Sequence, residues 1–220
     1  MKKAVILLSG GMDSCVSASI AKKEGFELCL LHINYGQRTE QRELKSFNQI
    51  ADFFKVKNKL IINMNYFPQI GGSCLTDSNI NVPKGNLDSN EIPISYVPFR
   101  NANILSAATS WAEIINPTAI YIGAVEEDSS GYPDCRKEFY DAFEKAIEKG
   151  TKPETSIRII SPLINLSKKE IVLKGIELNA PLDLTWSCYE KETQPCQKCD
   201  SCLLRARGVR SAGQLDPILT

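Results

Sequence analysis

Short apolar runs alternate along the chain with longer stretches in which apolar residues recur every three or four positions. Apolar runs of four to six residues, bounded by turn residues, are typical of buried strands. We expect such strands at 4–8, 28–33, 59–63, 119–122 and 157–160. The longer stretches have the period of amphipathic helices. We expect helices at 12–24, 39–54, 100–115, 136–149, after Ser167, and near 199–211.

Local signals sharpen these boundaries and define the fold class. Ser167 and Glu170 have the spacing of a capping box, which starts a helix, and Gly150 ends the preceding helix. Strands and helices alternate from residue 4 to about 160, so the chain is predicted to form an α/β domain. Its sheet should be doubly wound and mainly parallel, with helices on both faces. We assign this domain to residues 1–180 and a small C-terminal region to 181–220.

Residues 65–91 interrupt this regular alternation. They are rich in Gly, Asn, Ser and Pro and show no period. A loop of this length inside a compact domain is usually functional or disordered. A mobile lid over the active site and a variable surface insertion both fit this composition.

The composition limits the class and the location of the protein. Hydrophobic residues make up 43% of 220 residues, enough for one domain with a sizeable core, and 26 basic residues balance 26 acidic ones. Zero net charge gives no general attraction to nucleic acid, so we expect no direct nucleic-acid partner. No run of about 18 apolar residues predicts a membrane span. The apolar run after Lys2 and Lys3 is too short for a signal peptide, which predicts a cytoplasmic protein.

A candidate phosphate loop follows the first predicted strand, where a parallel sheet binds its ligands. It reads Ser9-Gly10-Gly11-Met12-Asp13-Ser14. Its glycines let the backbone turn tightly, and the free N–H groups of the next helix favour an anion. Asp13 would orient the loop or hold Mg²⁺ between phosphates. No Lys follows the glycines, so this is not a Walker A loop, and an ordinary strand–helix turn is the alternative.

The segment SGGMDS resembles the PP-loop of the ATP pyrophosphatase family, whose members cleave ATP to AMP and pyrophosphate. The resemblance implies an adenine nucleotide alpha hydrolase-like fold and an adenylated intermediate. It places the ATP-binding residues at Leu8, Ser9, Gly10, Gly11, Met12, Asp13, Ser14, Cys15, Val16, Ser17 and Ala18. The segment LCLLHINYGQR at 28–38 resembles the family segment that meets adenine. We give its His32 a packing role rather than a catalytic one.

Two later segments carry polar groups that suit a substrate. Arg100 lies where a loop enters a helix, so its planar cation can reach a phosphate or a carboxylate, unless it is an ordinary surface arginine. The turn after the strand at 119–122 offers a carboxylate and an aromatic ring, which together suit a planar base. A solvated turn with a helix cap is the alternative. The substrate-binding candidates in this turn are Asp128, Tyr132, Asp134 and Arg136.

The motifs GYPDCR and TWSCY, at 131–136 and 185–189, resemble the family of 7-cyano-7-deazaguanine synthases of the queuosine pathway, and the resemblance runs over nearly the whole chain. It implies an enzyme, a ligase, that joins 7-carboxy-7-deazaguanine and ammonia to give a nitrile, using ATP and Mg²⁺, and it suggests a homodimer. The catalytic candidates are Asp13, Arg100 and Lys168. The rivals are a PP-loop enzyme that thiolates tRNA and a zinc-ribbon binding module, which would use only the last 35 residues.

Half of the eight cysteines gather near the C-terminus as C-x₇-C-x₂-C-x₂-C, at Cys188, Cys196, Cys199 and Cys202. In a reducing compartment such a cluster is typical of a metal site. Four thiolates complete a tetrahedron and leave no open position, which indicates a structural ion. Zinc and an iron–sulfur cluster both suit four cysteines, and the family resemblance implies zinc. The role of Cys135 stays open.

Overall fold

The computed structural model describes residues 2–85, 91–126 and 131–219. Its described strands form one parallel sheet in the order β3-β2-β1-β4-β5. Their bounds are β1 Lys3–Leu7, β2 Glu27–Asn34, β3 Lys59–Asn63, β4 Ala119–Ile122 and β5 Arg158–Ile160. The chain winds outward from β1 to β3, then returns to the other side of β1 for β4 and β5. This topology confirms the doubly wound parallel sheet, with its switch point between β1 and β4.

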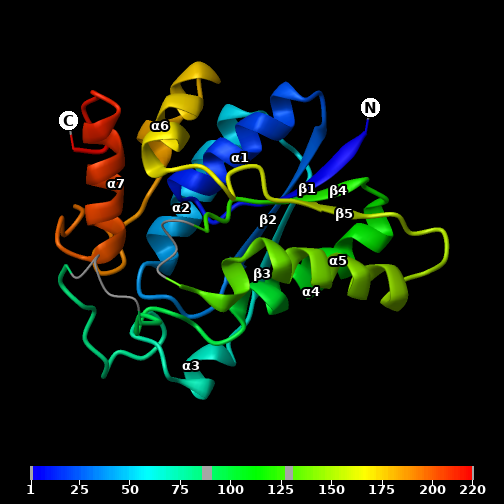
Figure 1. Ribbon diagram of the computed structural model, residues 1–220, viewed down its shortest axis with the longest axis horizontal. Coiled ribbons are helices and arrows are strands. Elements are labelled where there is room, and N and C mark those ends of the chain that lie inside the picture. The colour runs from blue at the N-terminus through cyan, green and yellow to red at the C-terminus, as the bar shows by residue number, and fades with distance from the viewer. Residues whose placement is uncertain (1, 86–90, 127–130, 220) are drawn as a thin grey trace.

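Helices cover both faces of the sheet, as Figure 1 shows. Their bounds are α1 Met12–Lys23, α2 Glu40–Phe53, α3 Phe67–Ile70, α4 Arg100–Ile115, α5 Lys137–Gly150, α6 Lys168–Glu177 and α7 Asp200–Ser211. Two short 3₁₀ turns, η1 Pro133–Cys135 and η2 Leu182–Leu184, complete the described elements. The capping box of Ser167 and Glu170 is present at the start of α6, as expected.

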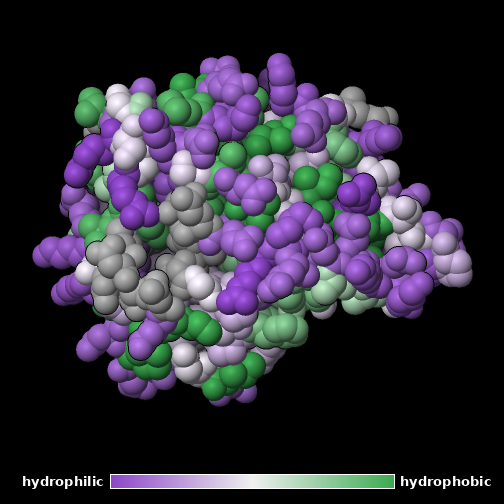
Figure 2. All heavy atoms as spheres, viewed as in Figure 1, coloured by the Kyte–Doolittle hydropathy of each residue, from purple (hydrophilic) through white to green (hydrophobic). Residues whose placement is uncertain are grey.

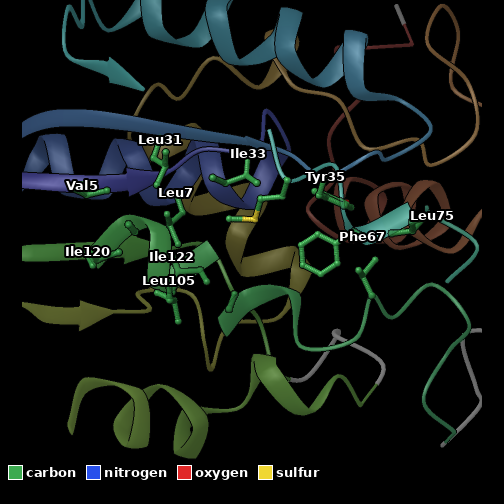
Figure 3. Packing of buried hydrophobic residues seen from close by; sticks show 14 of the residues in the cluster. Val5, Leu7, Leu31, Ile33, Tyr35, Phe67, Leu75, Leu105, Ile120 and Ile122 are labelled. Atoms are coloured by element: carbon green, nitrogen blue, oxygen red, sulfur yellow. The ribbon is translucent and has the colours of Figure 1, made fainter. Parts of the chain in front are cut away.

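The alternation of side chains along β1 explains how the layers are held together. Val5 and Leu7 point into one core and Ala4 and Ile6 into the other, because successive side chains of a strand face opposite ways. The first core also contains residues of α4 and α5, and Figure 3 shows Leu105 of α4 below β1 and β4. The second core contains residues of α1 and α2. Each large apolar side chain buried there contributes about 1.5–3 kcal/mol.

Helices α6 and α7 lie side by side beside α1 and form a third small core with it. Two glycines permit this close packing. A Cβ on Gly175 would meet Val16 of α1 at 3.0 Å, and one on Gly208 would meet Lys168 at 2.7 Å. Helix α6 therefore packs closely against α7 at its start and against α1 near its end, which fixes the position of Lys168.

The described part of the segment 65–91 packs against the rest of the domain, although its sequence shows no period. It contains α3, and its Phe67, Cys74 and Leu75 are buried in the first core. Arg38 donates hydrogen bonds to the carbonyls of Cys74, Asp77 and Ile80 at 2.6–2.8 Å. Residues 86–90 lie outside the described residues, and the lid interpretation stays a prediction.

The surface has the polar character of a globular protein. Hydrophilic side chains cover most of the face in Figure 2, and hydrophobic residues gather there only in small separate groups. Among the described residues, no helix combines the length and the apolar character needed to cross a bilayer.

Candidate active site

The loop Ser9–Ser14 joins β1 to α1 at the carboxyl edge of the sheet. Gly10 has a φ of +93°, and a Cβ there would meet the Glu43 carbonyl oxygen at 2.6 Å, so only glycine fits. Gly11 is the N-cap of α1, and no side chain caps that helix. The backbone N–H groups and the positive dipole end of α1 are therefore available to an anion.

Hydrogen bonds within the loop set its shape. The Ser9 and Ser14 hydroxyl oxygens lie 3.1 Å apart, the Gly11 N–H donates to Ser9 Oγ, and Ser14 Oγ donates to the Gly11 carbonyl. The residue after β4, Gly123, packs directly against the loop. A Cβ on Gly123 would meet backbone atoms of Asp13 and Ser14 at 2.8 Å. The loop is thus preorganised by contacts with two neighbouring elements.

Asp13 and Lys168 form an ion pair beside the loop. Lys168 Nζ lies 2.7 Å from Asp13 Oδ2, and both side chains are less than one third exposed. The other oxygen, Oδ1, is buried and has no hydrogen-bond partner among the described residues. A buried carboxylate oxygen without a donor is costly unless a cation or a ligand binds it. This oxygen suits Mg²⁺, which prefers carboxylate and phosphate oxygens.

A cavity of about 300 Å³ opens over the loop. Of the residues predicted from sequence, it is lined by Leu8, Ser9, Gly11, Met12, Asp13, Ser14, Arg100, Tyr132 and Lys168. Leu31 and Ile33 of β2 also line it, from the segment assigned to adenine. The cavity therefore joins the phosphate loop, all three catalytic candidates and one substrate candidate in one continuous space. The described residues of 65–91 are not part of its lining.

Other predicted residues lie outside this lining. Gly10 faces α2, and Cys15, Val16, Ser17 and Ala18 are buried within α1. Arg136 is half exposed and lies 3.6 Å from the Glu138 carboxylate, so the structure does not bring it to the cavity. Asp128 lies outside the described residues.

Asp134 is placed against the start of α4 rather than in the cavity. Its Oδ2 accepts a hydrogen bond of 2.9 Å from the backbone N–H of Asn101, and its carbonyl accepts one from Tyr140. Burial raises the pKa of Asp134 above its usual value. In this geometry the side chain caps α4 and so positions Arg100. Asp134 is 3% exposed, so it does not belong to the solvated turn that the sequence offered as the alternative.

Arg100 is held by an aromatic neighbour. Its Nη1 donates to the Tyr35 hydroxyl at 3.1 Å, and its guanidinium carbon lies 5.2 Å from the centre of the Tyr35 ring. Burial raises the pKa of Tyr35 to about 12, so the phenol stays neutral. Arg100 therefore keeps its full charge for an anionic ligand, with its direction fixed by Tyr35.

Sequence reasoning missed several residues that line the cavity. They are Tyr35 and Glu43 from the segment after β2, and Trp186, Tyr189 and Arg205 from the C-terminal region. The motif TWSCY was the only available signal for the C-terminal wall. Its Trp186 donates a backbone hydrogen bond of 2.9 Å to the Gly10 carbonyl, which attaches this wall directly to the phosphate loop.

The surroundings of His32 and Cys135 do not suit either side chain for a catalytic role. His32 is fully buried, and its two ring nitrogens lie 3.0 Å from the Leu8 carbonyl and from Asn34 Oδ1. Burial lowers its pKa, which fits the expected packing role. Cys135 lines the cavity, but burial raises the pKa of its thiol to about 11, so it is not an activated nucleophile.

The four cysteines of the C-terminal region converge on one point. Their Sγ atoms all lie within 4.8 Å of one another, on a loop and on the first turn of α7. Backbone N–H groups of Glu190, Lys191 and Cys196 point at Cys188 Sγ from 3.3–3.4 Å. Such donors stabilise thiolates, so the arrangement fits a metal ion with four sulfur ligands.

The fold and the loop define the class of protein first. A solved 4-thiouridine synthetase in complex with RNA and bound ATP superposes with a TM-score of 0.53 over 96% of this chain and 53% of that one. The sequence identity is 18%, so the likeness concerns the fold alone. The chain thus shares its fold with this ATP-binding synthetase.

Sequence comparison then narrows this class to one family. The chain belongs to the family described as queuosine biosynthesis protein QueC, whose model matches residues 3–213. It is 59% identical to the 7-cyano-7-deazaguanine synthase of Chlorobium chlorochromatii over 98% of this chain and 95% of that protein. It is 58% identical to the 7-cyano-7-deazaguanine synthase of Chlorobium phaeobacteroides over 98% of this chain and 96% of that protein.

Proposed function

We propose that this protein converts 7-carboxy-7-deazaguanine and ammonia to 7-cyano-7-deazaguanine at the expense of ATP, as a ligase. The relatives named for this product support the proposal. The observation that carries it is the single cavity that joins the SGGMDS loop to Arg100 and Tyr132. An enzyme that activates a carboxylate on a planar base needs a phosphate site, a cation and an aromatic wall in one space.

The chemistry follows from the weakness of a carboxylate as an electrophile. Its oxygen attacks the α-phosphorus of ATP, which forms an acyl-adenylate and releases pyrophosphate. Ammonia then attacks the acyl carbon, and AMP leaves to give the amide. A second ATP adenylates the amide oxygen, and loss of AMP and a proton from nitrogen leaves the nitrile. Each activation replaces a poor leaving group by AMP.

The residues of the cavity have roles that match these steps. The N–H groups at the start of α1, with Ser9 and Ser14, would bind the pyrophosphate part of ATP. Lys168 and Arg100 would neutralise charge that develops on phosphate and carboxylate oxygens. Leu31 and Ile33 would contact adenine, and Tyr132 would stack on the deazapurine. We also propose Asp128, Asp134 and Arg136 for recognition of the base.

Two metal ions complete the proposal. Asp13 Oδ1, which has no hydrogen-bond partner among the described residues, would hold Mg²⁺, and the ion would supply charge neutralisation there. Cys188, Cys196, Cys199 and Cys202 would hold one structural zinc ion, which would stabilise the region 181–220. This region would form a unit appended to the domain of residues 1–180. We also propose that the protein acts as a cytoplasmic homodimer without direct contact to nucleic acid.

The proposal is tested by supplying purified protein with ATP, 7-carboxy-7-deazaguanine and ammonium and measuring AMP, pyrophosphate and the nitrile. We expect two AMP molecules per nitrile formed. AMP release that requires tRNA and a sulfur donor would instead identify a thiolating enzyme. Absence of AMP under every condition would favour a binding module.

A further inference from the structure

Glu43 is a carboxylate in the wall of the cavity that the steps above leave unused. It lies in the first turn of α2 and lines the cavity with Ser9, Tyr35 and Arg100. Two buried side chains donate to it. Thr39 Oγ1 lies 2.8 Å from Oε1, and Gln37 Nε2 lies 3.2 Å from Oε2.

The two donors are themselves fixed. The amide oxygen of Gln37 accepts a hydrogen bond of 2.8 Å from the backbone N–H of Tyr35, which turns its NH₂ group toward Glu43. Gln37 and Thr39 are 5% and 1% exposed, so neither is free to move. The segment from Tyr35 to Glu43 therefore holds the carboxylate in one orientation and leaves each of its oxygens a lone pair for a ligand.

A carboxylate such as Glu43 is unexpected in the wall of a cavity that binds anions. ATP and a substrate carboxylate are both anions, and a wall carboxylate would repel them. Arg100 on α4 faces Glu43, as does the Tyr35 phenol, and Glu40 lies on the same helix. Arg100 is already directed by Tyr35 and is 3.1 Å from its hydroxyl. A second, cationic ligand would explain why the wall keeps an oriented carboxylate.

We propose that Glu43 binds the ammonium co-substrate and removes one of its protons. This inference rests on the proposed function, since ammonium is the co-substrate of that reaction that is a cation at neutral pH. Ammonium carries four N–H donors, and two of them can meet the lone pair that each carboxylate oxygen keeps. Burial raises the pKa of Glu43 from 4.5 to about 7, which matches a group that takes up and releases a proton near neutral pH.

The step balances without any further reagent. The Glu43 carboxylate takes one proton from ammonium and becomes the acid, and ammonia remains beside the acyl-adenylate. The nitrogen lone pair attacks the acyl carbon, the C–N bond forms and the C–O bond to AMP breaks. AMP leaves with the electron pair of that bond. The second proton lost from nitrogen goes to water, as does the proton held by Glu43.

The test uses the full-length protein and its two substrates, the acid and the amide. Conversion of the acid needs ammonium, whereas conversion of the amide to the nitrile does not. We expect Glu43→Gln to lower kcat/KM for ammonium by about 100-fold, the usual contribution of a general base, and to leave amide conversion within about 3-fold of wild type. Glu40→Gln removes a carboxylate one turn away and should leave both reactions unchanged.

Hydroxylamine gives a second readout, which separates loss of the base from a structural defect that would slow every nucleophile. It is a neutral nucleophile at pH 7.5 and needs neither charge recognition nor prior deprotonation. The Glu43→Gln variant should therefore form the hydroxamate from the acid at nearly the wild-type rate. The rate with ammonium should recover in part at high pH, where free ammonia accumulates.

Three outcomes would overturn the proposal. Equal loss of acid and amide conversion in Glu43→Gln would show that Glu43 serves ATP or ring binding. A raised Mg²⁺ requirement for both reactions would make it a metal ligand. Wild-type rates with ammonium would remove it from the reaction. If the wild-type protein releases no AMP with either substrate, the proposed function itself fails, and this inference fails with it.

Discussion

The two oxygens of Asp13 lie in different environments, and this difference explains why an acid belongs in a phosphate site. Oδ2 is neutralised by Lys168 at 2.7 Å, whereas Oδ1 is buried without a hydrogen-bond partner among the described residues. The ion pair with Lys168 offsets the charge of the acid and leaves one oxygen for Mg²⁺. In the proposed mechanism the acid would bring Mg²⁺ to the phosphates instead of repelling them.

Replacing Asp13 by Ala should lower kcat by at least about 100-fold, because a charge-stabilising group of the transition state is lost. The fold should remain, since this partly exposed loop side chain contributes little to core packing. Steady-state kinetics and thermal unfolding measure the two effects. Near wild-type turnover in this variant would remove Asp13 from the mechanism.

Glu43 also gives a prediction for stability against pH. The pKa of Glu43 is about 7 in the folded protein, against an ordinary value of 4.5 for the unfolded chain. Between these two pH values the folded protein binds one proton more than the unfolded chain. The contribution of this group to the free energy of unfolding is fully present below about pH 4.5 and is lost as the pH rises through about 7.

The difference in Tm between wild type and Glu43→Gln isolates this contribution, because the other carboxylates titrate in both proteins. Relative to the variant, wild type should lose stability steadily from pH 5 to pH 7.5. Parallel Tm curves for the two proteins over that range would contradict the raised pKa.

At the residue scale, the sequence revealed those groups whose partners are close in the chain. Ser9 to Ser14 form one loop, and the four cysteines lie within 15 residues, so their spacing alone carries the chemistry. Glu43 and Arg205 gave no such signal, because they reach the cavity through the packing of α2 and the C-terminal region against the loop. Arg136 belongs to the motif GYPDCR, but its side chain faces solvent. The direction of that side chain depends on the turn at η1, which the sequence does not reveal.

At the scale of elements, β4 and α1 meet so closely that a single methyl group would separate them. A Cβ on Gly123 would meet backbone atoms of the phosphate loop at 2.8 Å, and backbone cannot yield as a flexible side chain can. Gly150 at the end of α5 is a matched control, because nothing lies within 4 Å of a Cβ there.

Gly123→Ala should therefore destabilise the protein by about 1–3 kcal/mol through overpacking. For a chain of this size that corresponds to a fall in Tm of about 2–12 °C. It should also weaken ATP binding, since the loop must shift. Gly150→Ala should leave ATP binding and Tm unchanged or slightly raise the Tm. Equal behaviour of the two variants would contradict the close contact.

The metal site gives the second prediction at this scale. Cys199→Ala should lose the bound ion and lower the Tm by about 10 °C, since losing a structural metal costs several kcal/mol of folding energy. Metal analysis and calorimetry measure both effects, with Cys74→Ala as a control for loss of a buried thiol. Full metal content and wild-type Tm in Cys199→Ala would refute a structural role.

Most elements could be predicted because their hydrophobic periods are long and uninterrupted. The five strands and five of the helices agree with expectation to within about two residues at their ends. For α6 only the start was predicted, and its capped start is confirmed. The four-residue α3 could not be predicted, because one turn is too short to show a period. The packing of residues 65–85 was also invisible, since it depends on hydrogen bonds from the distant Arg38.

At the scale of the whole molecule, the C-terminal region completes the cavity that the parallel sheet begins. Trp186 bonds to Gly10, and the Arg42 guanidinium lies 4.4 Å from the centre of the Trp186 ring. Arg205 lines the cavity and is tied to Asp216 at 2.8 Å. The ion held by the four cysteines would thus stabilise one wall of the ATP site without touching the substrate.

The central claim is that the cavity adenylates a carboxylate, and oxygen-18 tests it most directly. The acid substrate, labelled in both carboxylate oxygens, is converted with ATP and ammonium, and the nucleotide products are analysed by mass spectrometry. We predict that each AMP carries one labelled oxygen in its phosphate and that the nitrile carries none, because both oxygens leave on the α-phosphorus. Unlabelled AMP, or label found in inorganic phosphate beside ADP, would contradict adenylation at this site.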